Sequence, residues 1–229
     1  MGLILSIETS TDICSVALSK EGITVAEQTI TQGQSHASSL TVIIEALFNG
    51  KGRPDIKMLD AVAVSCGPGS YTGLRIGVST AKGICYGLNI PLISIGSLQV
   101  LAAAVENRDN QPLHIAPMID ARRMEVYTAL YNSQLELETP VEAMVIDESA
   151  FAEQLSREEI LFVGNGAQKC MSVIKHPNAK FIADLHPLAT NMGKLAYAAF
   201  LRERFEDVAY FEPYYLKDFV AVVAKNKVL

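Results

Sequence analysis

Two short polar turns carry side chains that could bind an anion or hold a metal ion. The first, from Glu8 to Thr11, follows an apolar run, and its hydroxyls and backbone amides suit a phosphate group. The second, from Asp120 to Arg123, follows another apolar run that ends in an acidic residue. Because such hydroxyls also simply cap β-turns, we predict only a weak, degenerate phosphate-binding turn, formed by Thr9, Ser10 and Thr11.

A third candidate is the glycine-rich stretch from Cys66 to Gly73, which leads into a predicted helix. The N-terminus of a helix presents free amides and a partial positive charge to an anion. The Gly-Lys-Ser/Thr ending of a Walker loop is missing, which argues against a standard nucleotide loop. The glycines could instead allow a sharp turn into a closely packed helix. Both interpretations stay open at this point.

The composition disfavours a metal site and broad contact with nucleic acid. Four histidines and four cysteines occur, but no Cys-x-x-Cys, His-x-x-x-His or His-Glu-x-x-His spacing places two ligands together. We therefore expect no metal and no cofactor. The net charge is −6, whereas binding to nucleic acid depends mainly on Lys and Arg at the phosphates. Any RNA should therefore be bound mainly by another molecule.

The sequence also predicts a cytosolic chain without membrane association. Hydrophobic residues make up 49% and charged residues 19% of the chain, which is typical of a globular protein. No apolar run approaches the roughly 18 residues that a membrane-spanning helix needs. The first residues lack the basic region and cleavage site of a signal peptide.

The order of apolar runs and turns predicts an α/β protein with two similar halves. Strands are expected at 3–7, 13–18, 23–30, 59–65, 91–95, 114–119 and 125–131, and helices at 35–48, 72–88 and 97–105. The acidic turns at Glu8 and Asp120 are 120 − 8 = 112 residues apart. A chance likeness of two hairpins is the alternative to a true repeat. A repeat predicts an actin-like ATPase (ribonuclease H-like) fold, with lobes at 1–100 and 101–229, each a mixed sheet flanked by helices.

The two helices of the first lobe have more apolar surface than one sheet can cover. Helix 72–88 has an apolar face and a second face of small residues, and helix 36–48 has surplus apolar positions. The first helix could cover the second, or a partner's helices could complete a bundle. The second interpretation predicts a partner surface, and a homodimer when the chain is alone. This surface comprises His36, Leu40, Ile43, Ile44, Leu47, Gly73, Ile76, Gly77, Thr80 and Ile84.

Several segments together resemble the TsaB (YeaZ) family of tRNA threonylcarbamoyladenosine biosynthesis proteins. The segments are Ile4 to Thr11, Gly67 to Gly77, Ala81 to Gly83, Asp120 to Arg123 and Pro213 to Lys217. The resemblance implies an actin-like ATPase fold and a partnership with TsaD, the enzyme that transfers a threonylcarbamoyl group to the adenosine beside the tRNA anticodon. It also implies the small ATPase TsaE as a further associate.

The resemblance further implies that this chain is not itself the enzyme. TsaD carries two metal-binding histidines on the helix that begins just beyond the position of Gly96 to Val100, and this chain has no histidine there. A metallopeptidase would lack ligands for the same reason. The remaining alternative is an actin-like small-molecule kinase that uses ATP between the lobes, with Asp12, Asp120 and Glu125 as candidate acidic residues. The Ala-Arg-Arg sequence after Asp120 disfavours it, because phosphate needs a small turn to approach the backbone.

Overall fold

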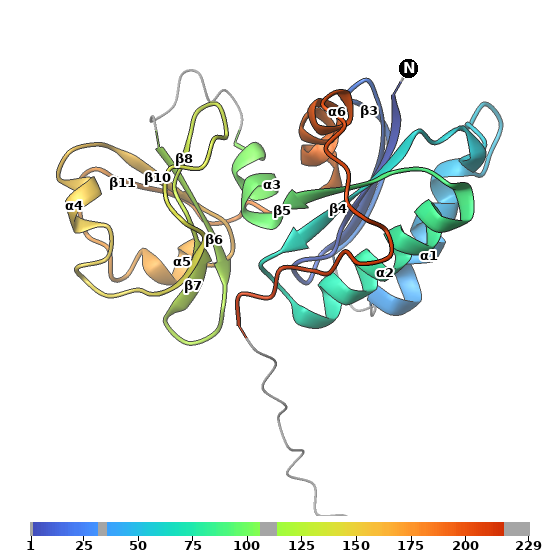
Figure 1. Ribbon diagram of the computed structural model, residues 1–229. Coiled ribbons are helices and arrows are strands. Elements are labelled where there is room, and N and C mark those ends of the chain that lie inside the picture. Colours follow the sequence, from blue (N-terminus) through green and yellow to red (C-terminus); the bar gives the residue numbers. More distant parts are fainter. Residues whose placement is uncertain (1, 32–35, 106–113, 218–229) are drawn as a thin grey trace, which may run out of the picture.

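The computed structural model describes residues 2–31, 36–105 and 114–217. Figure 1 shows two lobes, each built around one β-sheet. The first sheet has the strand order β3-β2-β1-β4-β5. Its strands are β1 (Leu3–Glu8), β2 (Cys14–Lys20), β3 (Ile23–Ile30), β4 (Ala61–Gly67) and β5 (Leu92–Gly96).

Helices cover both faces of the first sheet, so its central strands are apolar almost throughout. The first three strands are antiparallel, and β4 and β5 run parallel to β1. Leu5 and Ile7 pack with residues of α1 (His36–Phe48) and α2 (Tyr71–Leu88). Ile4 packs on the opposite face with Ala196 of α6 (Gly193–Leu201). Alternation along a strand sends successive side chains to opposite faces, which explains why β1 is buried on both sides.

The second sheet repeats the arrangement of the first. Its main path β9-β7-β6-β10-β11 has β6, β7 and β9 antiparallel and β10 and β11 parallel to β6. The predicted repeat and the mixed, two-lobed α/β fold are therefore confirmed. The elements are β6 (His114–Asp120), β7 (Glu125–Thr128), β8 (Tyr131–Asn132), β9 (Glu142–Val145), α4 (Ala152–Leu155), β10 (Ile160–Val163), α5 (Ala167–Cys170) and β11 (Ala179–Ile182).

The chain crosses between the lobes twice, and helices lie at both crossings. Helix α3 (Ser97–Ala103) follows β5 and packs against β6 of the second sheet as well as β4 and β5 of the first. After β11, the short helix η3 (Ala189–Met192) and α6 return to pack on the first sheet. The predicted division into lobes at residue 100 stays a prediction. Part of the chain after residue 100, including Met192 and Ala196, packs in the core of the first sheet.

Most element boundaries agree with the prediction to within two residues. The strand expected at 59–65 lies at Ala61–Gly67 and is joined to its predecessor through a short helix, η1 (Ile56–Met58). The strand expected at 125–131 is interrupted, because the Leu130 N–H donates to Thr139 Oγ1 instead of continuing the ladder. The predicted helix start at residue 35 and the polar stretch 106–112 lie outside the described residues. In the described ranges, no helix is both long and apolar enough to cross a membrane.

Candidate binding cleft between the lobes

A cleft of about 1070 Å³ lies between the lobes and brings the predicted polar turns together. Its first side is formed by the β1–β2 turn and the start of α2, including Ser10, Thr11 and Gly73. Its second side is formed by the β6–β7 turn, and residues 214–217 of the C-terminal segment close one end. Turns that are 112 residues apart in the sequence therefore face one cavity.

The first acidic residue, Glu8, is sealed in the protein interior and does not line this cleft. Its Oε1 accepts a hydrogen bond from the Ser10 N–H at 2.6 Å, whereas Oε2 has no hydrogen-bond partner among the described residues. Burial raises the pKa of Glu8 to about 7, although hydrogen bonds from Ser10 and Ser65 oppose the shift. A carboxyl group in this position can hold the turn, but it cannot reach a ligand in the cleft.

The neighbouring Thr9 is also used internally, by helix α2. Its hydroxyl donates to the carbonyl of Gly73 at 2.8 Å. A side chain at Gly73 would collide with Thr9 O, and one at Gly77 would collide with Thr9 Oγ1. The glycines therefore let the helix pack directly on the turn. Of the predicted phosphate-binding residues, Thr9 lies beneath the helix, and only Ser10 and Thr11 line the cleft.

The start of α2 is packed and capped. Ser70 Oγ accepts the Gly73 N–H at 3.2 Å, which satisfies one amide of the first helical turn. The Ser70 N–H itself donates to Ser10 O at 2.7 Å. A side chain at Gly69 would strike that same carbonyl group. These contacts support the structural interpretation of the glycine-rich loop, in which glycine permits a close approach of helix and turn.

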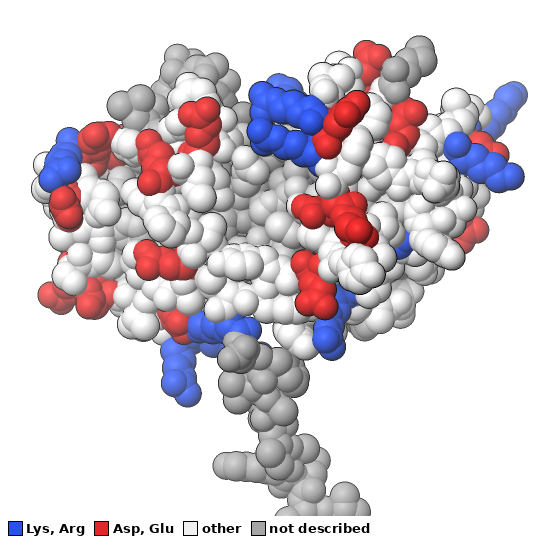
Figure 2. Space-filling model, viewed as in Figure 1, with Lys and Arg blue, Asp and Glu red and all other residues white. Residues whose placement is uncertain are grey.

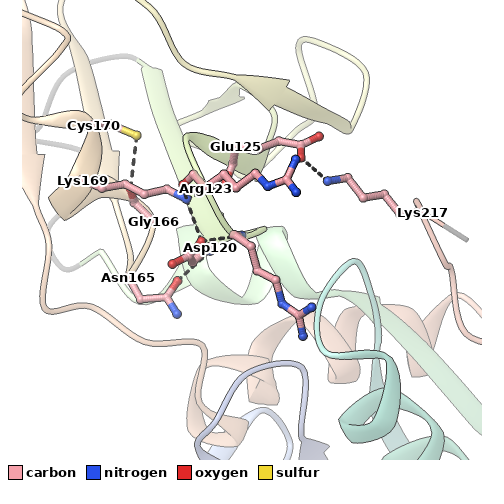
Figure 3. A network of polar contacts seen from close by, with 9 residues as sticks. Asp120, Arg123, Glu125, Asn165, Gly166, Lys169, Cys170 and Lys217 are labelled. Atoms are coloured by element: carbon pink, nitrogen blue, oxygen red, sulfur yellow. Dashed lines mark hydrogen bonds and ion pairs between the residues drawn. The ribbon is translucent and has the colours of Figure 1, made fainter. Parts of the chain in front are cut away.

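The second acidic turn is neutralised by a lysine (Figure 3). Lys169 Nζ donates to Asp120 Oδ1 at 2.6 Å and to the carbonyls of Arg123 and Glu125, each at 2.7 Å. All three hydrogens of the ammonium group therefore have acceptors. Asp120 Oδ1 also accepts the Arg122 N–H at 2.7 Å. The carboxylate is thus paired and hydrogen-bonded within its own turn.

The same turn has an unusual backbone conformation at two consecutive residues. Arg122 and Arg123 have φ values of 70° and 50°, in the left-handed region that favours glycine. Glu125 forms an ion pair with Lys217 across the cleft (Figure 3). Among the described residues, no group of three or more His, Cys, Asp or Glu side chains could hold a metal ion. Of the acidic residues considered for a kinase, only Asp12 is exposed without an ion pair in the described structure.

The predicted partner residues of the first helix face the lobe's own core. Leu40, Ile43, Ile44 and Leu47 are all buried there. The half-buried His36 places Nε2 2.7 Å from Thr11 O, so this nitrogen donates to the turn.

In the second helix, the predicted partner residues divide into buried and accessible ones. Gly73 and Gly77 are buried against Thr9, whereas Ile76, Thr80 and Ile84 are half-buried. The largest exposed apolar side chain of α1 is Val42, at 61% exposure, which lies outside the predicted partner surface. Binding of a partner at this helix pair stays a prediction.

The sequence reasoning missed two lysines that shape the cleft. Lys169 lies 49 residues after Asp120, and Lys217 lies 92 residues after Glu125. No local pattern links residues at such separations. The signal that could have indicated Lys169 is the repeat itself. It makes Asp120 the equivalent of Glu8, and the more exposed carboxylate of Asp120 calls for a cation that balances its charge.

The distribution of charge agrees with the expected weakness of direct nucleic-acid binding. Figure 2 shows one face of the molecule, on which lysines and arginines form small separate groups among acidic and uncharged residues. On that face, the described residues form no continuous basic band of the kind that tracks a phosphate backbone.

Comparison with known proteins identifies the family. Residues 24–225 match the family model described as TsaD: tRNA N6-adenosine threonylcarbamoyltransferase. The tRNA threonylcarbamoyladenosine biosynthesis protein TsaB of Bacillus subtilis is 34% identical over 171 residues, 71% of this chain and 70% of that protein. The protein of the same name from Escherichia coli is 30% identical over 228 residues, 95% of this chain and 96% of that protein.

A solved structure agrees with these relatives in fold. YeaZ from Pseudomonas aeruginosa superimposes with a TM-score of 0.79 at 27% identity, covering 94% of this chain and all of that one. The likeness therefore extends over both lobes, including the helices that cross between them. With the curated relatives above, it shows that the chain belongs to the TsaB family, within the wider group that shares the TsaD-like domain.

Proposed function

We propose that this chain is a non-catalytic partner and scaffold of a TsaD-like threonylcarbamoyltransferase, required to form N6-threonylcarbamoyladenosine next to the anticodon of tRNAs. The observation that carries the proposal is the contact of Lys169 with Asp120 at 2.6 Å. A phosphotransfer site of this fold needs acidic side chains free to hold a magnesium ion. Here Asp120 is paired with Lys169, Glu125 is paired with Lys217, and Glu8 is buried, so that among the described residues only Asp12 of the candidate acidic side chains is exposed without an ion pair.

The assembly that we propose places the chain in the cytosol beside two other proteins. A TsaD-like catalytic subunit binds it directly, a TsaE-like ATPase joins the complex, and tRNA is contacted only through the complex. The family names of the relatives support the pathway. The net charge of −6 and the scattered basic groups support the indirect role towards tRNA.

The surface that we propose for the catalytic subunit, and for a second copy when the chain is alone, is the outer side of α1 and α2. Val42 is 61% exposed there, and Ile76, Thr80 and Ile84 of α2 are half-buried. The buried glycines Gly73 and Gly77 contribute by bringing α2 close to its own turn. Exposed or half-buried apolar side chains on neighbouring helices are the usual anchors of a helical interface.

The test is a binding experiment with matched arginine variants. Val42→Arg places a charge on α1, whereas Val25→Arg places the same charge at a 53%-exposed position on β3. The side chain of Val25 points to the face of the sheet opposite α1, because its neighbour Ala26 packs with the α1 core. We expect both variants to fold, as shown by unchanged thermal melting.

Analytical ultracentrifugation and titration with a purified TsaD-like enzyme then measure association. Val42→Arg should weaken both self-association and binding of the enzyme at least about a hundredfold, because an arginine would be buried without a partner. Val25→Arg should leave both unchanged. If folded Val42→Arg binds the enzyme as tightly as the unmodified chain, the interface does not lie on these helices.

A further inference from the structure

The C-terminal strap, defined here as residues 206–217, crosses the first lobe and ends in the cleft (Figure 1). It begins beside β5, where the Glu206 N–H donates to Leu92 O at 2.8 Å. Lys82 of α2 then donates to the strap carbonyls of Ala209 at 3.1 Å and Phe211 at 2.9 Å. The strap is therefore attached to the sheet edge and to the helix before it reaches the cleft.

Next to the cleft, the strap lies directly against the end of β4. The Tyr214 N–H donates to Cys66 O at 2.7 Å. Gly67 has a φ of 115°, and a side chain there would come within 2.5 Å of Tyr214 O. Glycine at this position lets the two backbones approach closely. The Tyr215 ring lies 4.7 Å from the Tyr71 ring, between centroids, which holds the strap on the start of α2.

The last described residue of the strap, Lys217, contacts the second lobe. Its ammonium group pairs with Glu125 of β7 and lies 5.7 Å from the centre of the Tyr127 ring. Both partners are partly shielded, with side-chain exposures of 36% for Lys217 and 25% for Glu125. An ion pair that is partly withdrawn from water is screened less than one on the open surface.

The position of this contact matters because it lies apart from the two chain crossings, which also join the lobes. There, α3 packs against both β6 and η3. The contact of Lys217 with Glu125 lies in the cleft itself, together with the two polar turns. Rotation of the lobes about the crossings that widens the cleft would have to separate this pair.

We propose that the C-terminal strap is a latch that holds the two lobes in one arrangement, so that Lys217 and Glu125 set the width of the cleft. The latch is part of the chain and needs no bound ligand. Its anchors on the first lobe, Lys82 and the Tyr214 amide, keep the strap in place, and Lys217, its last described residue, joins it to Glu125 of the second lobe.

The reactivity of the Cys66 thiol, at the end of β4, should report whether the cleft is closed. Cys66 is half-buried, and burial raises the pKa of its thiol to about 11. The charge of Glu206 in the strap adds to this rise, and the charge of Cys66 contributes to a raised pKa at Tyr131 of the second lobe. The other three cysteines are buried within single lobes and report unfolding instead.

The experiment measures the rate at which a maleimide modifies each cysteine, resolved by peptide mass spectrometry. Lys217→Met removes the latch contact, and Lys180→Met makes the same change at an exposed lysine on β11. We expect Cys66 alone to react at least about tenfold faster in Lys217→Met, as for a local opening. Lys180→Met should match the unmodified chain. The double exchange Lys217→Glu with Glu125→Lys should restore slow modification.

Hydrogen exchange at the Tyr214 amide separates opening of the lobes from release of the strap. In Lys217→Met this amide should stay protected by Cys66 O while the Cys66 thiol becomes reactive. An unchanged rate at Cys66 would overturn the proposal. So would a loss of protection at Tyr214, since Lys217 would then hold only the strap, or an equal acceleration at all four cysteines, since the contact would then maintain the whole fold.

Discussion

The two acidic turns have equivalent places in their lobes but opposite environments. Glu8 ends β1, is fully buried and has a pKa raised to about 7 by burial. Asp120 ends β6, has a 46%-exposed side chain and pairs with Lys169. The first turn is closed by packing under α2, and the second is closed by a lysine that fills its carbonyl and carboxylate acceptors. Similar topology therefore does not preserve a pair of acidic groups available to a ligand.

The contrast shows two physical routes by which a cleft loses the capacity to hold a metal-bound phosphate. A buried carboxyl group loses water and is protonated more readily, so it is withdrawn from the cleft. An exposed carboxylate keeps its charge, but an adjacent ammonium group cancels its field. Both effects leave the cleft itself, with a volume of about 1070 Å³, in place.

The largest expected effect comes from filling the space between the first turn and α2. Gly77→Arg would force a side chain into Thr9 Oγ1 and bury a charge without a partner, so it should cost about 4 kcal/mol or more of stability. The control is Gly83→Arg on the same helix, where a side chain meets nothing within 4 Å. Thermal melting measures both. A normally stable Gly77→Arg protein would show that the first turn is not sealed by packing.

The second expected effect is a pH dependence of stability that arises from Glu8 in the first turn and has no counterpart at Asp120. Because the folded-state pKa of Glu8 is raised to about 7, its favourable contribution is complete below the unfolded value of 4.5 and is lost as the pH rises through 7. A glutamine at this position does not ionise. Between pH 4.5 and 8, the stability of Glu8→Gln should therefore rise by roughly 3 kcal/mol relative to the unmodified chain.

Urea unfolding at a series of pH values measures this difference. The matching change in the second lobe, Asp120→Asn, should shift stability by less than about 1 kcal/mol, because that side chain is 46% exposed. Parallel pH profiles for Glu8→Gln and the unmodified chain would mean that the Glu8 carboxyl group is solvated in the folded state.

A smaller effect on stability than either change in the first turn should come from the lysine that closes the second turn. Lys169→Met removes three hydrogen bonds, but Asp120 is exposed enough to regain water, so we expect a loss of about 1 to 2 kcal/mol. Lys180→Met, at a lysine whose side chain is 49% exposed, should change stability by less than about 0.5 kcal/mol. Equal unfolding midpoints for the two variants would show that Lys169 does not stabilise the second turn.

The fold could be predicted because its signals are local. Apolar runs, turns and helical spacing are read within short windows, and the 112-residue offset revealed the second lobe. Both limits of β3 and the end of α1 follow directly from such patterns. The return of α6 to the first sheet could not be predicted, because an amphipathic helix does not specify which of two sheets it covers.

The cleft could be predicted only in part, for the same physical reason. The turns were found from their residue types, and the close packing of glycines on a turn was kept open as an interpretation. The direction in which Gly77 faces was missed, because the small face of α2 fits its own turn as well as a partner helix. The pairing of Lys169 with Asp120 depends on two elements brought together by the sheet, and no spacing in the sequence reports it.

The most direct test of the account is a reconstituted tRNA modification assay with a cleft variant. Asp120→Asn combined with Lys169→Met removes the ion pair between the second turn and α5 while leaving the outer side of α1 and α2 untouched. If the chain is a non-catalytic partner, a TsaD-like enzyme supplied with this variant should form threonylcarbamoyladenosine within about twofold of the normal rate. A loss of about a hundredfold, with the complex still formed, would place catalysis in this cleft and contradict the account.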